Sequence, residues 1–225
     1  MAAIVWLDFE GAVVGDGLTA AFFEAFAPSI WAGVRDAPGR GEMTREQALI
    51  AAMGAVEAPE DAMRAWVRDH ARVAPDLYDL TDWAHWHGWL PIVVSTAPDL
   101  LVDTVLDDLG LDRITRHCPR AQFHYRWRLT YFSPRGVEIE DRFAVAYAAA
   151  FRRAGDFVAY VGADPAGSEA AQLAQVTFAR DGLLHALGGP DGRIREWTSL
   201  RDVKDALDRE GEAWLATFST AATER

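Results

Sequence analysis

The segment from residue 2 to residue 11, AAIVWLDFEG, decides the fold class of this chain. Its first six residues form a short, continuous apolar run rich in β-forming side chains, which is typical of a buried strand in a parallel sheet. The run ends at Asp8, and Glu10 follows two positions later. We therefore expect a buried strand that brings two carboxylates to the loop at its end.

Similar apolar runs recur along the chain and predict three more buried strands, at residues 90–95, 157–161 and 176–179. Helical patterns lie around them, at residues 74–87, 98–110, 142–153 and 199–218. Alternating aromatic and polar residues at 122–130 predict a half-exposed strand in a hairpin. The alternation of strands and helices predicts an α/β fold with a Rossmann-like parallel sheet covered on both faces.

The stretch between the first two predicted strands has helical signals and no strand signal. Thr44 fits a helix N-cap with Gln47 at the third helical position, and Pro59 precedes two acidic residues that are typical of another helix start. We therefore expect a helical cap at residues 15–74, inserted into a core formed by residues 1–14 and 75–225.

Composition limits the function classes. The chain has 225 residues, half of them hydrophobic, and a formal net charge of −12. This charge argues against nucleic acid or an anionic membrane as partner, but it allows a small phosphorylated substrate in a local basic pocket. No apolar run approaches a membrane span, and Cys118 is the only cysteine. We expect a cytoplasmic protein, and the sequence does not indicate its oligomeric state.

Polar or turn residues stand at three predicted strand ends: Asp8, Ser95 and Gly162. Because ligands of such sheets bind beyond the carboxyl ends of the strands, we expect these residues to share one site. Asp8 can act as a nucleophile, Glu10 can donate a proton, and Mg²⁺ would neutralise the repulsion between Asp8 and a phosphate. Each feature also has a structural explanation: solvated loop acids, a helix cap at Ser95, and a plain turn at Gly162.

Three segments together resemble the motifs of haloacid-dehalogenase-like phosphatases: LDFEG at 7–11, VVSTA at 93–97 and YVGADPAGSEAA at 160–171. With VTFARDGLL at 176–184 and the helical insert, the chain resembles the phosphoserine phosphatase group and its methionine-salvage phosphatase relatives. The resemblance runs from Ile4 to about Leu207. It implies that Asp8 is the nucleophile and a metal ligand, that Glu10 is the acid/base with its carbonyl on Mg²⁺, and that Ser95 binds the phosphoryl group.

The chain departs from this family pattern at several positions. Ala163 and Gly167 stand where the family has two acids, so Asp164 is the nearest candidate for a third metal ligand beside Asp8 and Glu10. The family also has a lysine at the start of the helix before the strand of the fourth motif, but Lys204 is the only lysine here. The candidates for this cationic role are Arg142 and, behind it, Arg135, although arginine offers a fixed fork where lysine offers a point charge.

The same resemblance suggests how a substrate is held. Gly11 and Thr96 are expected to contact it beside the catalytic residues, and Phe22 and Phe23 suggest a rather apolar pocket under the cap. Phosphoserine phosphatases keep an arginine in the cap helix for the substrate carboxylate. The stretch at 47–53, QALIAAM, has no charge, so phosphoserine is not the expected substrate.

Three functions are consistent with these features. The first is a Mg²⁺-dependent phosphomonoester hydrolase that forms an aspartyl-phosphate on Asp8. The second is an enzyme of the same fold with changed chemistry, either metal-independent or a different reaction, for which the replaced acids at Ala163 and Gly167 argue. The third is a non-catalytic binding protein that keeps the fold.

Overall fold

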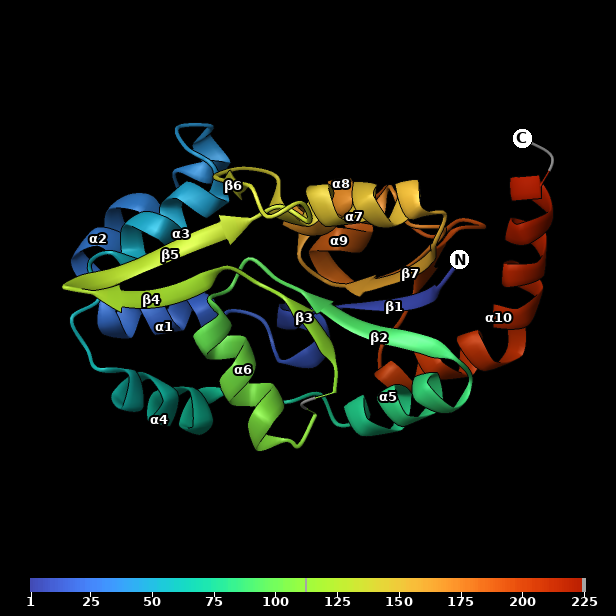
Figure 1. Ribbon diagram of the computed structural model, residues 1–225, viewed down its shortest axis with the longest axis horizontal. Coiled ribbons are helices and arrows are strands. Elements are labelled where there is room, and N and C mark those ends of the chain that lie inside the picture. The colour runs from blue at the N-terminus through green and yellow to red at the C-terminus, as the bar shows by residue number, and fades with distance from the viewer. Residues whose placement is uncertain (112, 224–225) are drawn as a thin grey trace.

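The computed structural model describes residues 1–111 and 113–223 and is built around one parallel sheet (Figure 1). The strand order is β3-β2-β1-β7-β8-β9. The strands are β1 (Ala3–Asp8), β2 (Trp89–Val94), β3 (Thr115–His117), β7 (Phe157–Gly162), β8 (Val176–Ala179) and β9 (Ile194–Glu196). All neighbours in the sheet are parallel, so the predicted Rossmann-like α/β fold is confirmed.

The apolar runs of the sequence form the strands because helices cover both faces of the sheet. Every residue of β7 and of β8 is buried. The covering helices are α5 (Leu77–Trp86), α6 (Asp99–Asp108), α7 (Phe143–Ala154), α8 (Ser168–Ala171), α9 (Asp181–Ala186) and α10 (Leu200–Thr223). Figure 1 shows α7 and α8 on one side of the strands, whereas α5 and the first turns of α10 lie on the other.

Four α-helices lie between β1 and α5, the helix that leads back to the sheet at β2. They are α1 (Leu18–Phe26), α2 (Pro28–Val34), α3 (Arg45–Met53) and α4 (Glu60–His70). The N-terminus of α3 has the predicted capping box, since Thr44 accepts from the Gln47 amide and the Gln47 side chain accepts from the Thr44 amide. The helical character of this insert therefore follows from local sequence signals, and we refer to residues 15–74 as the helical insert.

A second, antiparallel sheet lies beside the helical insert in Figure 1. Its strands are β4 (Arg120–His124), β5 (Arg126–Phe132) and β6 (Glu138–Ile139), and α3 packs against β5. The single strand predicted at 122–130 is in fact two strands, because the chain reverses at Tyr125, whose φ is 63°. The sequence has no glycine or asparagine at this turn, so the usual signal for a reversal is missing.

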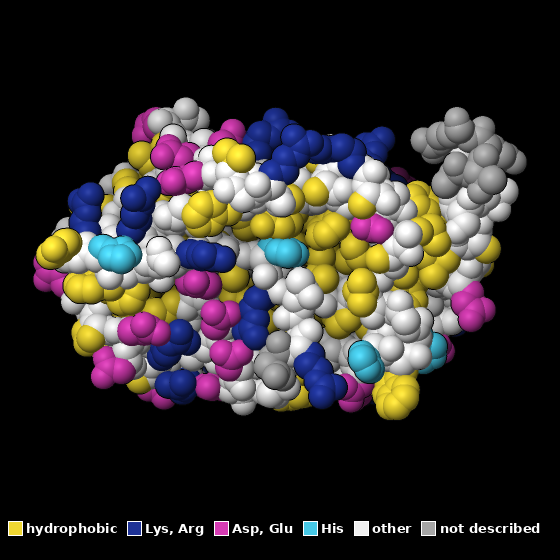
Figure 2. Space-filling view, in the orientation of Figure 1, with side chains coloured by type: hydrophobic (Ala, Val, Ile, Leu, Met, Phe, Trp, Pro, Cys, Tyr) yellow, Lys and Arg dark blue, Asp and Glu magenta, His cyan; other side chains and the backbone are white. Residues whose placement is uncertain are grey.

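Charge is unevenly distributed on the surface. Figure 2 shows Lys and Arg side chains gathered along the upper edge in that view, over α7, which has Arg152 and Arg153 in its last turn. The net charge of the whole chain is nevertheless −12. Among the described residues, no helix has both the length and the apolar character needed to cross a bilayer.

Candidate active site

Asp8 is the last residue of β1 and lies at the carboxyl edge of the sheet. Trp6 and Asp8 are two positions apart on the strand, so their side chains point to the same face. The Trp6 indole donates a hydrogen bond from Nε1 to Asp8 Oδ1 at 3.2 Å. Tyr160, the register partner of Trp6 on β7, donates from its hydroxyl to Asp8 Oδ2. Both carboxylate oxygens are therefore held by neutral donors from the sheet.

The surroundings of Asp8 favour its neutral form. Burial raises the pKa of Asp8 from 3.8 to about 7, although the hydrogen bonds from Tyr160 and Trp6 act in the opposite direction. The absence of a side chain at Gly162 makes room for this carboxylate, since a Cβ there would lie 2.6 Å from Asp8 Oδ2. Asp8 is thus a preorganised carboxylate that exchanges its proton close to neutral pH.

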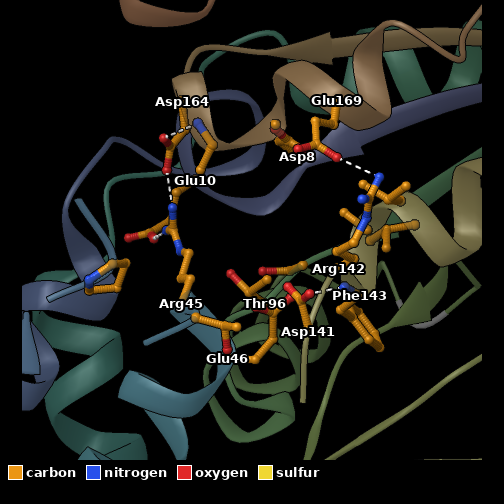
Figure 3. A pocket seen from close by; sticks show the side chains of 18 of the residues that line it. Asp8, Glu10, Arg45, Glu46, Thr96, Asp141, Arg142, Phe143, Asp164 and Glu169 are labelled. Atoms are coloured by element: carbon orange, nitrogen blue, oxygen red, sulfur yellow. Dashed lines mark hydrogen bonds and ion pairs between the residues drawn. The ribbon is translucent and has the colours of Figure 1, made fainter. Parts of the chain in front are cut away.

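Asp8 opens onto a cavity of about 410 Å³, shown from close by in Figure 3. The predicted residues that line it are Asp8, Glu10, Ser95, Thr96, Arg142 and Asp164. Other residues that were not among the predicted site residues also line it, including Arg45, Glu46, Asp141, Tyr160 and Glu169. The structure therefore brings together the ends of β1, β2 and β7, as the position of Asp8, Ser95 and Gly162 predicts.

Ser95 and Thr96 follow β2, the strand next to β1. The Ser95 hydroxyl accepts a hydrogen bond from the Ala97 amide at 3.0 Å and retains its own proton as a donor. The Thr96 carbonyl accepts from the buried Tyr131 hydroxyl at 2.7 Å, which fixes the loop. This loop is a rigid, hydroxyl-bearing wall of the cavity and suits a phosphoryl group.

Arg142 precedes α7 and lines the cavity, whereas Arg135 is exposed in the turn between β5 and β6 and does not. Arg142 adopts a left-handed conformation with a φ of 55°. Its guanidinium forms an ion pair with Glu169 at 2.7 Å, and its side chain is 61% exposed. Of the two arginines predicted to replace the missing lysine, the geometry favours Arg142.

Glu10 and Asp164 are linked by a cation from the helical insert. Arg45 Nη1 lies 2.5 Å from Asp164 Oδ2, and Arg45 Nη2 lies 3.9 Å from Glu10 Oε2. Burial raises the pKa of Glu10 despite its hydrogen bond from the Thr19 amide. Burial also disfavours the charged form of Asp164, but Arg45 and the Ala166 amide together outweigh this and lower the pKa of Asp164. Glu10 is suited to carry a proton, whereas Asp164 is a fixed anion.

The predicted Mg²⁺ ligands are not assembled as a metal site. The described residues contain no group of three His, Cys, Asp or Glu side chains placed to hold a metal ion. Asp164 is bound to Arg45, and Asp8 Oδ2 accepts from Tyr160. Because a guanidinium and a hydroxyl occupy these oxygens, the set of Asp8, Glu10 and Asp164 does not fit a divalent cation as it stands.

Three residues predicted to contact the substrate do not line this cavity. Phe22 and Phe23 are fully buried and pack against Phe26, Trp31 and Trp66 inside the helical insert. Gly11 is also buried, and its carbonyl accepts from Arg180 at 2.9 Å. The aromatic pair therefore forms a hydrophobic core, and the expectation of an apolar substrate pocket loses its basis.

The stretch at 47–53 has no charge, but α3 begins two residues earlier, at Arg45, which lines the cavity. A charged residue just after the predicted N-cap at Thr44 is the signal that could have identified Arg45 as a candidate residue of the cavity. Trp6 was also detectable, since it precedes Asp8 by two positions on a predicted strand. No local signal distinguishes Tyr160, because its neighbours are simply those of a buried strand.

Gly11 is a position where substitution is expected to destabilise the fold. It has a φ of +89°, and a Cβ would lie 2.7 Å from the Cβ of Ala163 and 2.9 Å from Asp16 Oδ1. We expect Gly11→Ala to lower the free energy of unfolding by about 3 kcal/mol, through backbone strain and overlap together. Urea denaturation measures this.

Gly17→Ala is the matched control for this prediction. Gly17 has a similar φ of +84°, but a Cβ at this position would have no atom within 4 Å. Its substitution should therefore cost about 1 kcal/mol through strain alone. Equal losses in the two variants would contradict the role of the Gly11–Ala163 contact.

Comparison with known proteins supports the fold. The sequence matches no model of a known protein family and no curated protein sequence. The structure is similar to phosphoserine phosphatase from T. onnurineus, with 16% identity and a TM-score of 0.65 over 91% of this chain and 94% of the other. It is also similar to a phosphoserine phosphohydrolase-like protein from Francisella tularensis, with 13% identity and a TM-score of 0.59 over 92% of this chain and 100% of the other.

A probable phosphoserine phosphatase from Vibrio cholerae is also similar, with 15% identity and a TM-score of 0.63 over 100% of this chain and 67% of the other. At such identities the likeness concerns the fold. The chain thus has a haloacid-dehalogenase-like fold of the phosphoserine phosphatase type, as the motif order predicts.

Proposed function

We propose that this chain is a phosphomonoester hydrolase of the haloacid-dehalogenase type, with Asp8 as its nucleophile. The observation that carries the proposal is the position of Asp8 at the end of the central strand. There it faces one cavity together with Ser95 from the neighbouring strand and the guanidinium of Arg45. A carboxylate nucleophile, a hydroxyl donor and a cation are the groups that phosphoryl transfer requires.

In the first step an Asp8 oxygen attacks the phosphorus of the substrate. A bond forms between phosphorus and the Asp8 oxygen, and the bond from phosphorus to the ester oxygen breaks. The leaving alkoxide takes a proton from Glu10, whose raised pKa keeps that proton available. The products are an alcohol and an aspartyl-phosphate.

In the second step water attacks the phosphorus of the aspartyl-phosphate. Glu10, now ionised, takes a proton from this water, and the bond from phosphorus to the Asp8 oxygen breaks. Inorganic phosphate leaves, and both carboxyl groups return to their starting states. Ser95 and Arg45 remain fixed and stabilise the charge on the phosphoryl oxygens.

The sequence predicts Mg²⁺ as cofactor, but the residues as placed do not fit it, and neither step above passes through a metal. The helical insert would act as a cap, because α3 delivers Arg45 to the cavity from above the strand ends. A cavity of about 410 Å³ suits a small phosphorylated metabolite rather than a macromolecule. The single cysteine fits a reducing compartment such as the cytoplasm.

One observation favours a second candidate, a non-catalytic phosphate-binding protein. Asp8 has a pKa of about 7 and accepts a hydrogen bond from Tyr160, so part of it is protonated and unreactive at neutral pH. Such a carboxyl group can hold a ligand without attacking it. The two candidates differ in one measurable property: the hydrolase releases phosphate from a phosphomonoester, whereas the binding protein does not.

The hydrolase is tested by trapping the covalent intermediate. We expect the purified chain to release phosphate from members of a panel of small phosphomonoesters at pH 8. In samples quenched with acid during turnover, the tryptic peptide of residues 1–35, which contains Asp8, should gain the mass of one phosphoryl group. Phosphate release without this modification would refute the aspartyl-phosphate route, and no release from the whole panel would favour the binding protein.

A further inference from the structure

Arg45 occupies the position between two core carboxylates that a bound cation would take. In Figure 3 its guanidinium points toward Glu10 and Asp164, which come from the loops after β1 and β7. The Arg45–Asp164 pair and the Arg142–Glu169 pair stand on opposite sides of the cavity, with Asp8 between them. Arg45 is thus placed to face a phosphoryl group on Asp8.

The residues beside Arg45 hold it in this position. The Thr44 hydroxyl donates to the Glu140 carbonyl at 2.6 Å. The buried Glu46 carboxylate accepts from the Phe143 amide at 2.8 Å, at the N-terminus of α7. Since both neighbours are tied to the segment that leads into α7, Arg45 is fixed relative to Asp8 rather than swinging with a loose helix.

On the other side of Asp8, the structure leaves no room for a second acid. A Cβ at Gly167 would overlap the Tyr160 hydroxyl oxygen and lie 3.2 Å from Asp8 Oδ2. Ala163 is buried and lies against Gly11. The replacement at Gly167 is therefore matched by a compensating neighbour, Tyr160.

We propose that Arg45 is the resident cation of this site and binds the phosphoryl group of a ligand in place of a divalent metal, with Tyr160 holding Asp8. That the ligand is a phosphate ester is taken from the proposed function, on which this proposal rests. It accounts for the missing acids, the Arg45–Asp164 pair and the Tyr160–Asp8 hydrogen bond by one arrangement. A single arginine also offers two parallel donors to phosphoryl oxygens, which suits this role.

Equilibrium binding of inorganic phosphate and of Mg²⁺ tests the proposal by calorimetry. In EDTA the wild-type chain should bind phosphate, and replacing EDTA with 10 mM MgCl₂, roughly a physiological excess, should change the dissociation constant less than about twofold. Mg²⁺ alone should give no saturable heat and no shift in the thermal unfolding midpoint. Arg45→Ala should weaken phosphate binding at least about tenfold, and Arg45→Lys should retain an intermediate affinity.

Arg35→Ala is the matched control. Arg35 follows the last residue of α2, and its side chain is 51% exposed. Within the described residues its ion pairs are with two exposed acids, Glu24 and Asp36. This variant should bind phosphate as the wild type does. Circular dichroism of Arg45→Gln, which keeps the length of the side chain, shows whether loss of the charge alone disturbs folding. A folded Arg45→Gln with wild-type phosphate affinity would overturn the proposal.

A variant designed to gain Mg²⁺ binding tests the proposal independently. Tyr160→Phe with Gly167→Asp removes the hydroxyl and adds the missing acid, and Arg45→Ala frees Asp164 and Glu10. We expect the triple variant to show saturable Mg²⁺ binding that the wild type lacks. Saturable Mg²⁺ binding by the wild type itself, or loss of its phosphate binding in EDTA, would refute the proposal.

These measurements need no turnover, so the two proposals fail separately. If phosphate binding depends on Arg45 and not on Mg²⁺ while no phosphomonoester is hydrolysed, the proposed hydrolase function is refuted and the proposed role of Arg45 is supported. If hydrolysis requires Mg²⁺, the proposed hydrolase function is supported and the proposed role of Arg45 in place of a metal is refuted.

Discussion

Asp8→Asn is expected to reduce phosphate release by roughly a thousandfold or more, because an amide does not attack phosphorus and the aspartyl-phosphate cannot form. The size and shape of the side chain are kept. The asparagine oxygen can accept from Trp6, and its amide can donate to the Tyr160 oxygen, so the local structure has no reason to change. The measurement is initial-rate phosphate release at pH 8 under saturating substrate.

Asp16→Asn is the control, since it is the same substitution at an exposed position outside the cavity that contains Asp8. Its rate should equal that of the wild type. Undiminished release by Asp8→Asn would contradict the nucleophilic role of Asp8 and, with it, the proposed mechanism.

The same Asp8→Asn variant is expected to be more stable than the wild type above pH 7. The pKa of Asp8 is raised from 3.8 to about 7 by burial. Below pH 3.8 the group is neutral in both the folded and the unfolded chain, so it does not affect stability there. As pH rises toward 7, the unfolded chain ionises first and the wild type loses stability, and above pH 7 this loss is complete.

Asparagine stays neutral at every pH and avoids this loss. We expect Asp8→Asn to raise the free energy of unfolding by roughly 2 to 4 kcal/mol at pH 8, and by close to zero near pH 4. Urea denaturation at both pH values measures the difference. A variant that is inactive and also less stable at pH 8 would indicate misfolding rather than a lost nucleophile.

Trp6→Ala is expected to give the largest loss of stability among simple substitutions near the site, about 3 to 5 kcal/mol. Trp6 is 0% exposed; its ring packs edge-on against Phe151, with 6.0 Å between centroids, and in a tilted arrangement against Tyr160, with 5.4 Å between centroids. Truncation leaves a cavity between β1 and α7 and removes the donor to Asp8. Trp86→Ala, at an 83% exposed position, is the control and should change stability by less than about 0.5 kcal/mol.

Trp6→Phe separates the packing of Trp6 from its hydrogen bond. The phenylalanine ring keeps most of the packing contacts but has no Nε1 donor. In the wild type the hydrogen bond from this donor lowers the pKa of Asp8. Its loss should raise the pKa of Asp8 further and move the acid limb of the pH–rate profile to higher pH. An unmoved acid limb would show that the Trp6 hydrogen bond does not tune the nucleophile.

Much of the fold was predictable because its determinants are local. Each buried strand is an apolar run, and the capping box at Thr44 and Gln47 marks the start of α3 in four residues. The turn at Tyr125 was not predictable, since it adopts a positive φ without the residue types that favour one. The edge strands β3 and β9 were also missed, because three residues are too few to show a period.

The sequence by itself determined which residues stand at the strand ends, and so it located Asp8, Ser95 and the altered acids at Ala163 and Gly167. Only the tertiary structure decided what surrounds them. Arg45 meets Asp164 across 119 positions of the chain, and Tyr160 meets Asp8 across 152. Such contacts have no signature in a local pattern, because they depend on how the helical insert docks on the sheet and on which strands become neighbours.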